Sequence, residues 1–148
     1  MVRTVQGETV SVVGFYIGDL CYALSDEAYY GGWGRMVKDS DRWKDSGSPG
    51  FQEGAFTYDG STVIVAHTAH GDGCYHDATD SIDFPVDSGC IGIVPLELVG
   101  DMEKAANLGK VVLGRYARMY VEDGRFRFRI STDEPLVICI DTNDGEDD

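Results

Sequence analysis

The stretch that decides the fold is RYARMYVEDGRFRFRIS, residues 115–131, where apolar and polar side chains alternate on both sides of one Asp-Gly step. Alternation with a period of two predicts β-strands. An Asp-Gly pair supplies the two residues with positive φ that a two-residue hairpin turn requires. We therefore predict a hairpin within residues 110–131 that turns at Asp123-Gly124. The segment EPLVICID, residues 134–141, is predicted as a third strand of the same sheet.

Counting outward from the turn fixes the register of this hairpin. One face is apolar throughout, and it pairs Val121 with Phe126, Met119 with Phe128, and Ala117 with Ile130. The other face is polar, and it pairs Glu122 with Arg125, Tyr120 with Arg127, Arg118 with Arg129, and Tyr116 with Ser131. A shift of one residue would mix the two faces, so the turn and the alternation specify the same pairing.

The predicted polar face concentrates arginine in a protein whose formal net charge is −14. Like charges directly opposite each other destabilise a sheet unless an anion or a carboxylate lies between them. Guanidinium groups beside phenol rings suit a phosphate and a planar base. The candidate ligand-binding residues are therefore Arg118, Arg129, Arg127, Tyr116 and Tyr120. Two alternatives stay open: the arginines pair with some of the 26 acidic residues on an ordinary surface, or the face meets an acidic protein partner.

The rest of the chain predicts further strands. GAFTYDGSTVIVAH, within residues 51–68, is a second hairpin that turns at an Asp-Gly step, and residues 9–18 and 90–95 are apolar, β-branched runs. A third Asp-Gly step, Asp72-Gly73, has the same turn chemistry.

Helices are predicted to be few and short. Residues 24–30 and 95–109 have helix-starting signals, and Gly100 divides the second segment into two pieces. The fold class is therefore mainly β, a β-rich α+β protein built as a small antiparallel barrel or sandwich with one or two short helices. We expect residues 1–141 to form a single β-rich domain and residues 142–148 to be an acidic, disordered tail.

Composition excludes several classes of function. A strongly negative protein repels polyphosphate, which argues against nucleic acid as a partner. No apolar run approaches the ~20 residues that a membrane-spanning helix needs, and the first residues lack a secretory signal. We therefore expect a soluble, cytoplasmic protein without a membrane partner. Its acidic surface suits a basic protein partner.

The segment HTAHGDGCYHDATD, residues 67–80, contains every histidine of the chain. Imidazole and carboxylate groups suit Zn²⁺, Mn²⁺ or Fe²⁺, so the candidate metal ligands are His67, His70, Asp72, His76 and Asp77. Their spacing matches no standard zinc signature. The alternative is a tight Asp-Gly turn whose polar side chains bond the local backbone. Apart from such a divalent metal, the sequence predicts no cofactor.

The four cysteines allow one further chemical hypothesis. Cys74 or Cys21, activated by a nearby histidine, would be a nucleophile. Neighbouring carboxylates oppose this because they disfavour a thiolate. Cys139, inside an apolar run, is predicted to be a small buried residue.

Three blocks of sequence together resemble a family of small uncharacterised proteins from bacteria and their phages. The blocks are IGDLCYAL (17–24), HTAHGDGCYHD (67–77) and VDSGCIGIVPLEL (86–98), which match the patterns GDxCY, TAxGDGxY and VD[SA]GxIG. The resemblance implies no activity, but it directs attention to Asp19, Cys21, Asp72, Tyr75 and Asp87. The three aspartates beside glycine turns suit either an oxygen-rich cation site or the capping of those turns.

These observations favour a binding module over an enzyme, because no catalytic signature is present. We expect a small β domain, encoded by a phage or a bacterium, that holds a small anionic, nucleotide-like ligand or a protein partner. One alternative is a metal-dependent hydrolase that uses residues 67–77. The other is an acidic interaction or inhibitor protein whose surface mimics nucleic acid or caps a basic partner.

Overall fold

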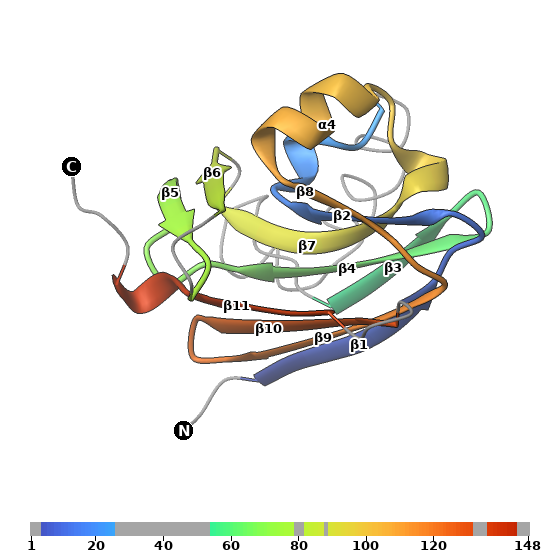
Figure 1. Cartoon of the computed structure of the whole chain (residues 1–148). Helices are drawn as coiled ribbons and strands as arrows, with labels where there is room; N and C mark the ends of the chain where they lie inside the picture. The colour runs from blue at the N-terminus through green and yellow to red at the C-terminus, as the bar shows by residue number, and fades with distance from the viewer. Residues whose placement is uncertain (1–3, 26–53, 79–81, 88, 132–135, 145–148) are drawn as a thin grey trace, which may run out of the picture.

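The fold is mainly β and antiparallel, with only short helices (Figure 1). The structure, a computed structural model, describes residues 4–25, 54–78, 82–87, 89–131 and 136–144. The predicted fold class is confirmed. Of the two predicted architectures the sandwich fits, since no sheet of the described residues closes into a barrel.

The predicted hairpin forms the centre of a four-stranded sheet. Strands β9 (Tyr116–Glu122) and β10 (Arg125–Ser131) pair in the predicted register, with Val121 opposite Phe126 and Arg118 opposite Arg129. The predicted third strand is also confirmed as β11 (Leu136–Asp141), which pairs with β10. Strand β1 (Thr4–Val10) completes the order β1-β9-β10-β11.

A second sheet of five strands packs against the first. Its order is β3-β4-β7-β2-β8, with bounds Gly54–Tyr58, Ser61–His67, Cys90–Pro95, Gly14–Gly18 and Lys110–Leu113. The hairpin predicted within residues 51–68 is confirmed, because Tyr58 pairs with Ser61 across a two-residue turn. The strand predicted at residues 90–95 is confirmed as β7.

Two predicted strands are wrong in their extent, because the chain changes sheets within them. Residues 9–18 divide between β1 and β2, where the Ser11 hydroxyl accepts hydrogen bonds from the amides of Val13 and Gly14. Residues 110–113 belong to β8 and not to the hairpin. A hydrogen bond links the two places where the chain passes from one sheet to the other: the Ser11 amide donates to the Arg115 carbonyl at 3.1 Å.

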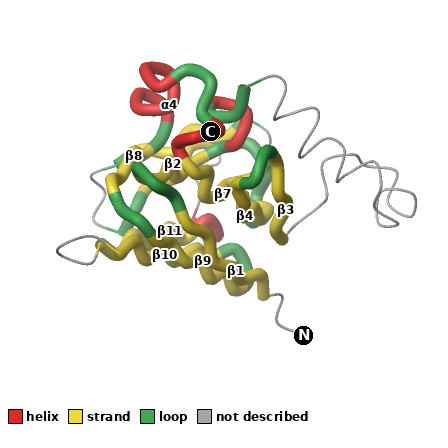
Figure 2. Tube along the Cα trace, turned by 90° about the vertical axis from the view of Figure 1, so that its right-hand side faces the viewer, coloured by secondary structure: helices red, strands yellow, loops and turns green. Residues whose placement is uncertain are grey.

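The described helices between β2 and β8 lie on the outer side of the five-stranded sheet (Figures 1 and 2). The division predicted within residues 95–109 is confirmed: η3 (Leu96–Leu98) and α4 (Met102–Leu108) are separate, and Asp101 caps α4 by accepting from the Lys104 amide. A further 3-10 helix, η1 (Leu20–Tyr22), follows β2. The helix predicted at residues 24–30 lies outside the described residues from residue 26 onward.

The chain continues in ordered backbone beyond the predicted domain boundary at residue 141. Thr142–Asp144 form the 3-10 helix η4, and Thr142 is fully buried with its hydroxyl donating to the Gly124 carbonyl. The predicted tail begins at residue 142 and so includes these three residues, whereas residues 145–148 lie outside the described residues.

The core fills the space between the two sheets. The apolar strip predicted for the hairpin is confirmed as part of it, because each of its six side chains is at most 2% exposed: Ala117, Met119, Val121, Phe126, Phe128 and Ile130. Phe15, Ile17 and Ile64 of the facing sheet belong to the same cluster. A second cluster, which includes Tyr16 and Leu20, fills the space between the five-stranded sheet and the helices.

A small third sheet extends the four-stranded sheet at β11. It consists of β5 (Gly73–His76) and β6 (Asp83–Val86), and Asp77 forms a bridge with Ile140 of β11. The turn predicted at Asp72-Gly73 is wrong, since Gly73 begins β5 and β5 does not pair with β4. The chain bends over residues 68–72 instead, because the Thr68 hydroxyl and the Tyr75 phenol both donate to the Gly71 carbonyl.

The two Asp-Gly hairpin turns allow a matched test of the fold. Gly60 and Gly124 have φ of 83° and 81°, so alanine at either position should cost about 1 kcal/mol in backbone strain. A Cβ at Gly60 meets nothing within 4 Å, whereas one at Gly124 lies 2.8 Å from Ala69 Cβ and 2.9 Å from Thr142 Oγ1. Chemical denaturation should therefore show Gly124→Ala to be about 1–2 kcal/mol more destabilising than Gly60→Ala. Equal losses would contradict the packing of η4 on this turn.

Candidate functional site

The outward face of the four-stranded sheet carries polar side chains in register. One row across the strands is Gln6, Tyr120, Arg127 and Cys139, and the next row is Glu8, Arg118, Arg129 and Val137. All eight side chains are exposed. Strand alternation explains this arrangement, because the residues between them on β9 and β10 are those of the core strip. We call Arg118, Tyr120, Arg127 and Arg129 the arginine face.

The arginine face contains a hollow of about 380 Å³. Its lining consists of Gln6, Arg118, Met119, Tyr120, Arg127 and Arg129. Three arginines thus line one hollow, and none of the described residues in its lining carries a carboxylate. The charge at this hollow is therefore positive, although the net charge of the protein is −14.

The pairing of the arginines decides which of them can take a ligand. Arg118 donates to the Tyr116 hydroxyl at 3.3 Å and to Glu8 Oε1 at 3.0 Å, and Tyr116, followed by Glu8, raises the pKa of the Arg118 guanidinium. Glu8 lies on β1, so it reaches Arg118 from the side away from Arg129. Within the described part of the chain, neither Arg127 nor Arg129 has an ion pair or a side-chain hydrogen bond. Among the described residues, the alternative of ordinary surface pairing therefore holds for Arg118, and no partner of this kind is found for Arg127 or Arg129.

Tyr120 stands beside the two arginines with its phenol fixed. Its hydroxyl donates to Glu122 Oε2 at 2.8 Å, and this hydrogen bond, followed by desolvation, raises its pKa. The phenol is therefore protonated at neutral pH. Tyr116 lies at the end of β9, where it accepts from Arg118 and does not line the hollow.

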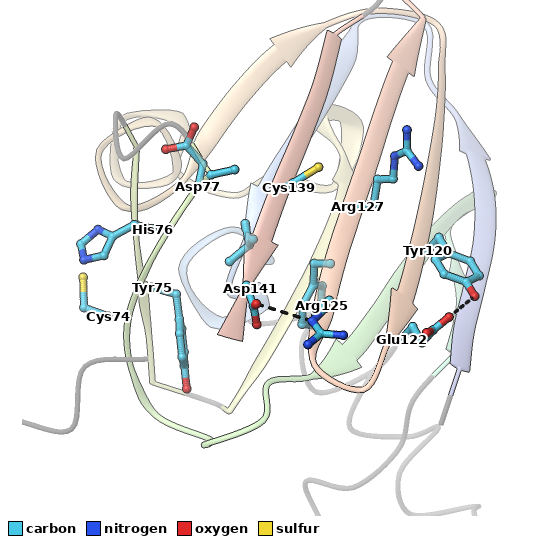
Figure 3. Close-up of a pocket in the computed structure, with 13 residues that line it drawn as sticks. Cys74, Tyr75, His76, Asp77, Tyr120, Glu122, Arg125, Arg127, Cys139 and Asp141 are labelled. Atoms are coloured by element: carbon cyan, nitrogen blue, oxygen red, sulfur yellow. Dashed lines mark hydrogen bonds and ion pairs between the residues drawn. The ribbon is translucent and has the colours of Figure 1, made fainter. Parts of the chain in front are cut away.

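A larger hollow of about 640 Å³ adjoins the first and shares Tyr120 and Arg127 with it (Figure 3). Residues 74–78 form one side, and β9, β10 and β11 form the other. Arg125 lines it while paired with Asp141, with 3.5 Å between Nε and Oδ2. Sequence reasoning missed this hollow because it depends on the contact of β5 with β11, which no local pattern specifies.

The five predicted metal ligands are not brought together. Each histidine has a different partner: His67 Nδ1 lies 3.4 Å from Cys90 Sγ, His70 Nε2 lies 3.1 Å from the Asn143 carbonyl, and His76 Nδ1 lies 2.7 Å from Asp83 Oδ1. Asp77 Oδ1 accepts from the Ile82 amide, and Asp72 is exposed. Across the described ranges, no group of three or more His, Cys, Asp or Glu side chains has a geometry that could hold a metal ion.

Residues of the first and third sequence blocks meet at the carboxylate of Asp19. This carboxylate is fully buried; its Oδ1 accepts from the Cys21 amide at 2.9 Å and its Oδ2 from the Asp87 amide at 2.6 Å. The second block joins the third, since the Thr68 amide donates to the Gly89 carbonyl at 3.0 Å. The sequence predicts either a cation site or the capping of turns for these aspartates, and Asp19 caps a turn.

No family model, curated protein or solved structure matches this chain. The resemblance of the three blocks to small bacterial and phage proteins therefore stays a prediction. No helix in the described residues is long and apolar enough to cross a membrane.

The cysteines differ from their predictions. Burial and then the charge of Asp19 raise the pKa of the Cys21 thiol, which opposes its use as a nucleophile. The prediction that Cys139 is buried is wrong, because this residue is exposed on the outward face of β11. Cys139 and the exposed Cys74 both line the larger hollow. The four cysteines, all in the described residues, form no disulfide.

Proposed function

We propose that this protein is a binding module that holds a small organic anion, nucleotide-like in character, on the arginine face. The observation that carries the proposal is the hollow of about 380 Å³, which three arginines line and to which the described part of the chain contributes no carboxylate. Its position beside a larger hollow supports a ligand of two parts, one anionic and one not. Small-molecule sites commonly measure about 300–1,000 Å³, which matches both hollows.

The anionic part of the ligand binds Arg127 and Arg129. Guanidinium groups accommodate phosphate or carboxylate oxygens through pairs of parallel hydrogen bonds. Both arginines lack an acidic partner within the described part of the chain, so a ligand displaces no ion pair. Arg118, already paired with Glu8, adds charge at the edge of the hollow.

The uncharged part of the ligand extends over Tyr120 into the larger hollow. Tyr120 lines both hollows, and its hydrogen bond to Glu122 restricts its ring. A planar base stacks favourably on such a ring. The net charge of −14 opposes a long polyanion, so the proposed ligand is a short anion and not a nucleic acid.

The resemblance of the three sequence blocks to bacterial and phage proteins supports a proposal about where the protein acts. The protein acts in the cytoplasm of a bacterium or of a phage-infected cell, and it binds its ligand without transforming it. The metal-dependent hydrolase is not favoured, because the three histidines have three different partners. The acidic inhibitor remains a competing hypothesis and predicts that a basic protein copurifies.

A thermal-shift titration with adenosine monophosphate and other nucleotides tests the proposal. A ligand at about 100 times its Kd stabilises the folded state by about 2.7 kcal/mol, so Tm should rise by several degrees. Arg129→Glu should abolish the rise. Arg115→Glu changes the net charge equally at an exposed position outside both hollows, so it should retain the rise.

His70→Ala separates the proposal from the hydrolase. It should leave the nucleotide response unchanged, because His70 lines neither hollow. Stoichiometric zinc or manganese in the purified protein, together with a response lost in His70→Ala and kept in Arg129→Glu, would support the hydrolase instead.

A further inference from the structure

The larger hollow carries more hydrogen-bond acceptors than cationic groups. Its described lining includes three carboxylates, from Asp77, Glu122 and Asp141, and two guanidinium groups, from Arg125 and Arg127. Arg125 is already paired with Asp141, with 3.5 Å between Nε and Oδ2. Ionised carboxylates accept hydrogen bonds and donate none. The part of a ligand that enters this hollow is therefore favoured if it presents donors and carries no negative charge.

Glu122 is the carboxylate of this hollow that is best placed to accept from a ligand. Asp141 Oδ1 accepts from the Asn143 amide at 3.0 Å. Asp77 Oδ1 likewise accepts from the Ile82 amide at 2.8 Å. Within the described part of the chain, Glu122 Oε2 accepts one hydrogen bond, from the neighbouring phenol, and Oε1 accepts none. A carboxylate oxygen has two lone pairs, so both oxygens of Glu122 can accept from a ligand.

Glu122 also lies where the far edge of a stacked base would be. It follows Tyr120 on the outward face of β9, and Tyr120 follows Arg118, the residue opposite Arg129. Successive residues on one face of a strand are about 7 Å apart, which is twice the rise per residue. A ligand whose anion binds Arg129 and whose base stacks on Tyr120 thus directs the edge of that base toward Glu122. Figure 3 shows Tyr120 and Glu122 joined by their hydrogen bond at one side of the hollow.

Guanine is the base whose edge matches a carboxylate. Its N1–H and N2–H donors are adjacent and parallel, so they form two hydrogen bonds with the two oxygens of one carboxylate. Adenine presents one donor beside a ring nitrogen with a lone pair, which a carboxylate repels. We propose that the ligand of this protein is a guanine nucleotide and that Glu122 accepts from N1–H and N2–H of its base. The inference rests on the proposed nucleotide site and adds its base specificity.

Isothermal titration calorimetry of the full chain with guanosine monophosphate and adenosine monophosphate tests the inference. The guanine nucleotide should bind with a Kd about tenfold lower, within the range by which a bidentate contact to a base edge discriminates. Inosine monophosphate keeps N1–H but lacks the N2 amino group, so its Kd should lie between the other two.

Glu122→Gln is the decisive variant. Glutamine keeps one oxygen for the Tyr120 phenol but places an amide donor against the donors of guanine, so the preference for guanine should disappear. The affinity for adenosine monophosphate should not fall, because glutamine pairs its own donor and acceptor with those of adenine. Glu103→Gln removes the same charge at an exposed position on α4 outside both hollows, and it should retain the tenfold preference.

The outcomes separate this inference from the proposed function. Equal affinities for the two nucleotides in the native protein, or a preference that survives in Glu122→Gln, would overturn the assignment of guanine to Glu122 and leave nucleotide binding at the arginine face intact. Failure of both nucleotides to bind, or binding that Arg129→Glu does not weaken, would overturn the proposed function and this inference with it.

Discussion

Replacing Phe128 by alanine should lower the free energy of unfolding by about 4 kcal/mol, the range expected for deleting a buried ring and leaving a cavity. Phe128 is completely buried between the two sheets. It lies opposite Met119, and its ring centroid is 6.0 Å from that of Phe126. Urea denaturation followed by circular dichroism measures the loss.

Arg127→Ala is the matched control for Phe128→Ala. Arg127 is the preceding residue on the same strand, but its side chain is exposed on the outward face. Its removal should change stability by less than about 0.5 kcal/mol. Comparable losses of stability in the two variants would mean that β10 does not alternate as described. The outward placement of the arginine face would then be contradicted as well.

Asp19→Ala should be nearly as destabilising, at about 3 kcal/mol. The Asp19 carboxylate is fully buried and accepts the amide of Cys21, two residues away, and the amide of Asp87, 68 residues away. Alanine would leave these two amides, which make partly buried hydrogen bonds, without their acceptor, and each such donor costs about 1–3 kcal/mol. For a chain of this length, Tm should fall by about 10 °C in calorimetry.

Two further variants calibrate the Asp19 result. Asp19→Asn keeps one carbonyl oxygen as an acceptor, so it should recover part of the lost stability. Asp101→Ala removes an aspartate that caps α4 at an exposed position, and it should cost only about 1 kcal/mol. A loss at Asp19 no greater than that at Asp101 would contradict the role of this carboxylate as a buried connection between two blocks.

The register of the central hairpin could be predicted because two independent signals agree. The Asp123-Gly124 turn and the period-two alternation of β9 and β10 each specify the same pairs. The arginine face follows from this register without further information. The same alternation would also have placed Cys139 outward, because Ile138 and Ile140 on either side of it face the core.

The changes of sheet could not be predicted from the same signals. Residues 9–18 are apolar almost throughout, and a strand of that composition gives no sign that its two halves pair in different sheets. The bend depends on the Ser11 side chain and on a hydrogen bond to Arg115, a residue more than 100 positions away. Contacts between residues so far apart in the sequence form only when the chain packs, so no local pattern indicates them.

The histidine segment shows that the types of residue in a segment do not by themselves predict a metal site. Three histidines within ten residues suggested a metal, yet β5 turns away from β4, and each imidazole faces a different segment. The larger hollow was equally beyond prediction, because residues 74–78 reach β11 through non-local contacts, among them the bridge between Asp77 and Ile140.

The most direct test of the account is a titration of ¹⁵N-labelled protein with adenosine monophosphate, followed by amide chemical shifts. The proposed function predicts that the largest shifts fall on residues 118–120 and 127–129, and that Arg129→Glu removes them. Shifts centred on residues 67–77, or none at millimolar nucleotide, would contradict the assignment of the ligand to the arginine face.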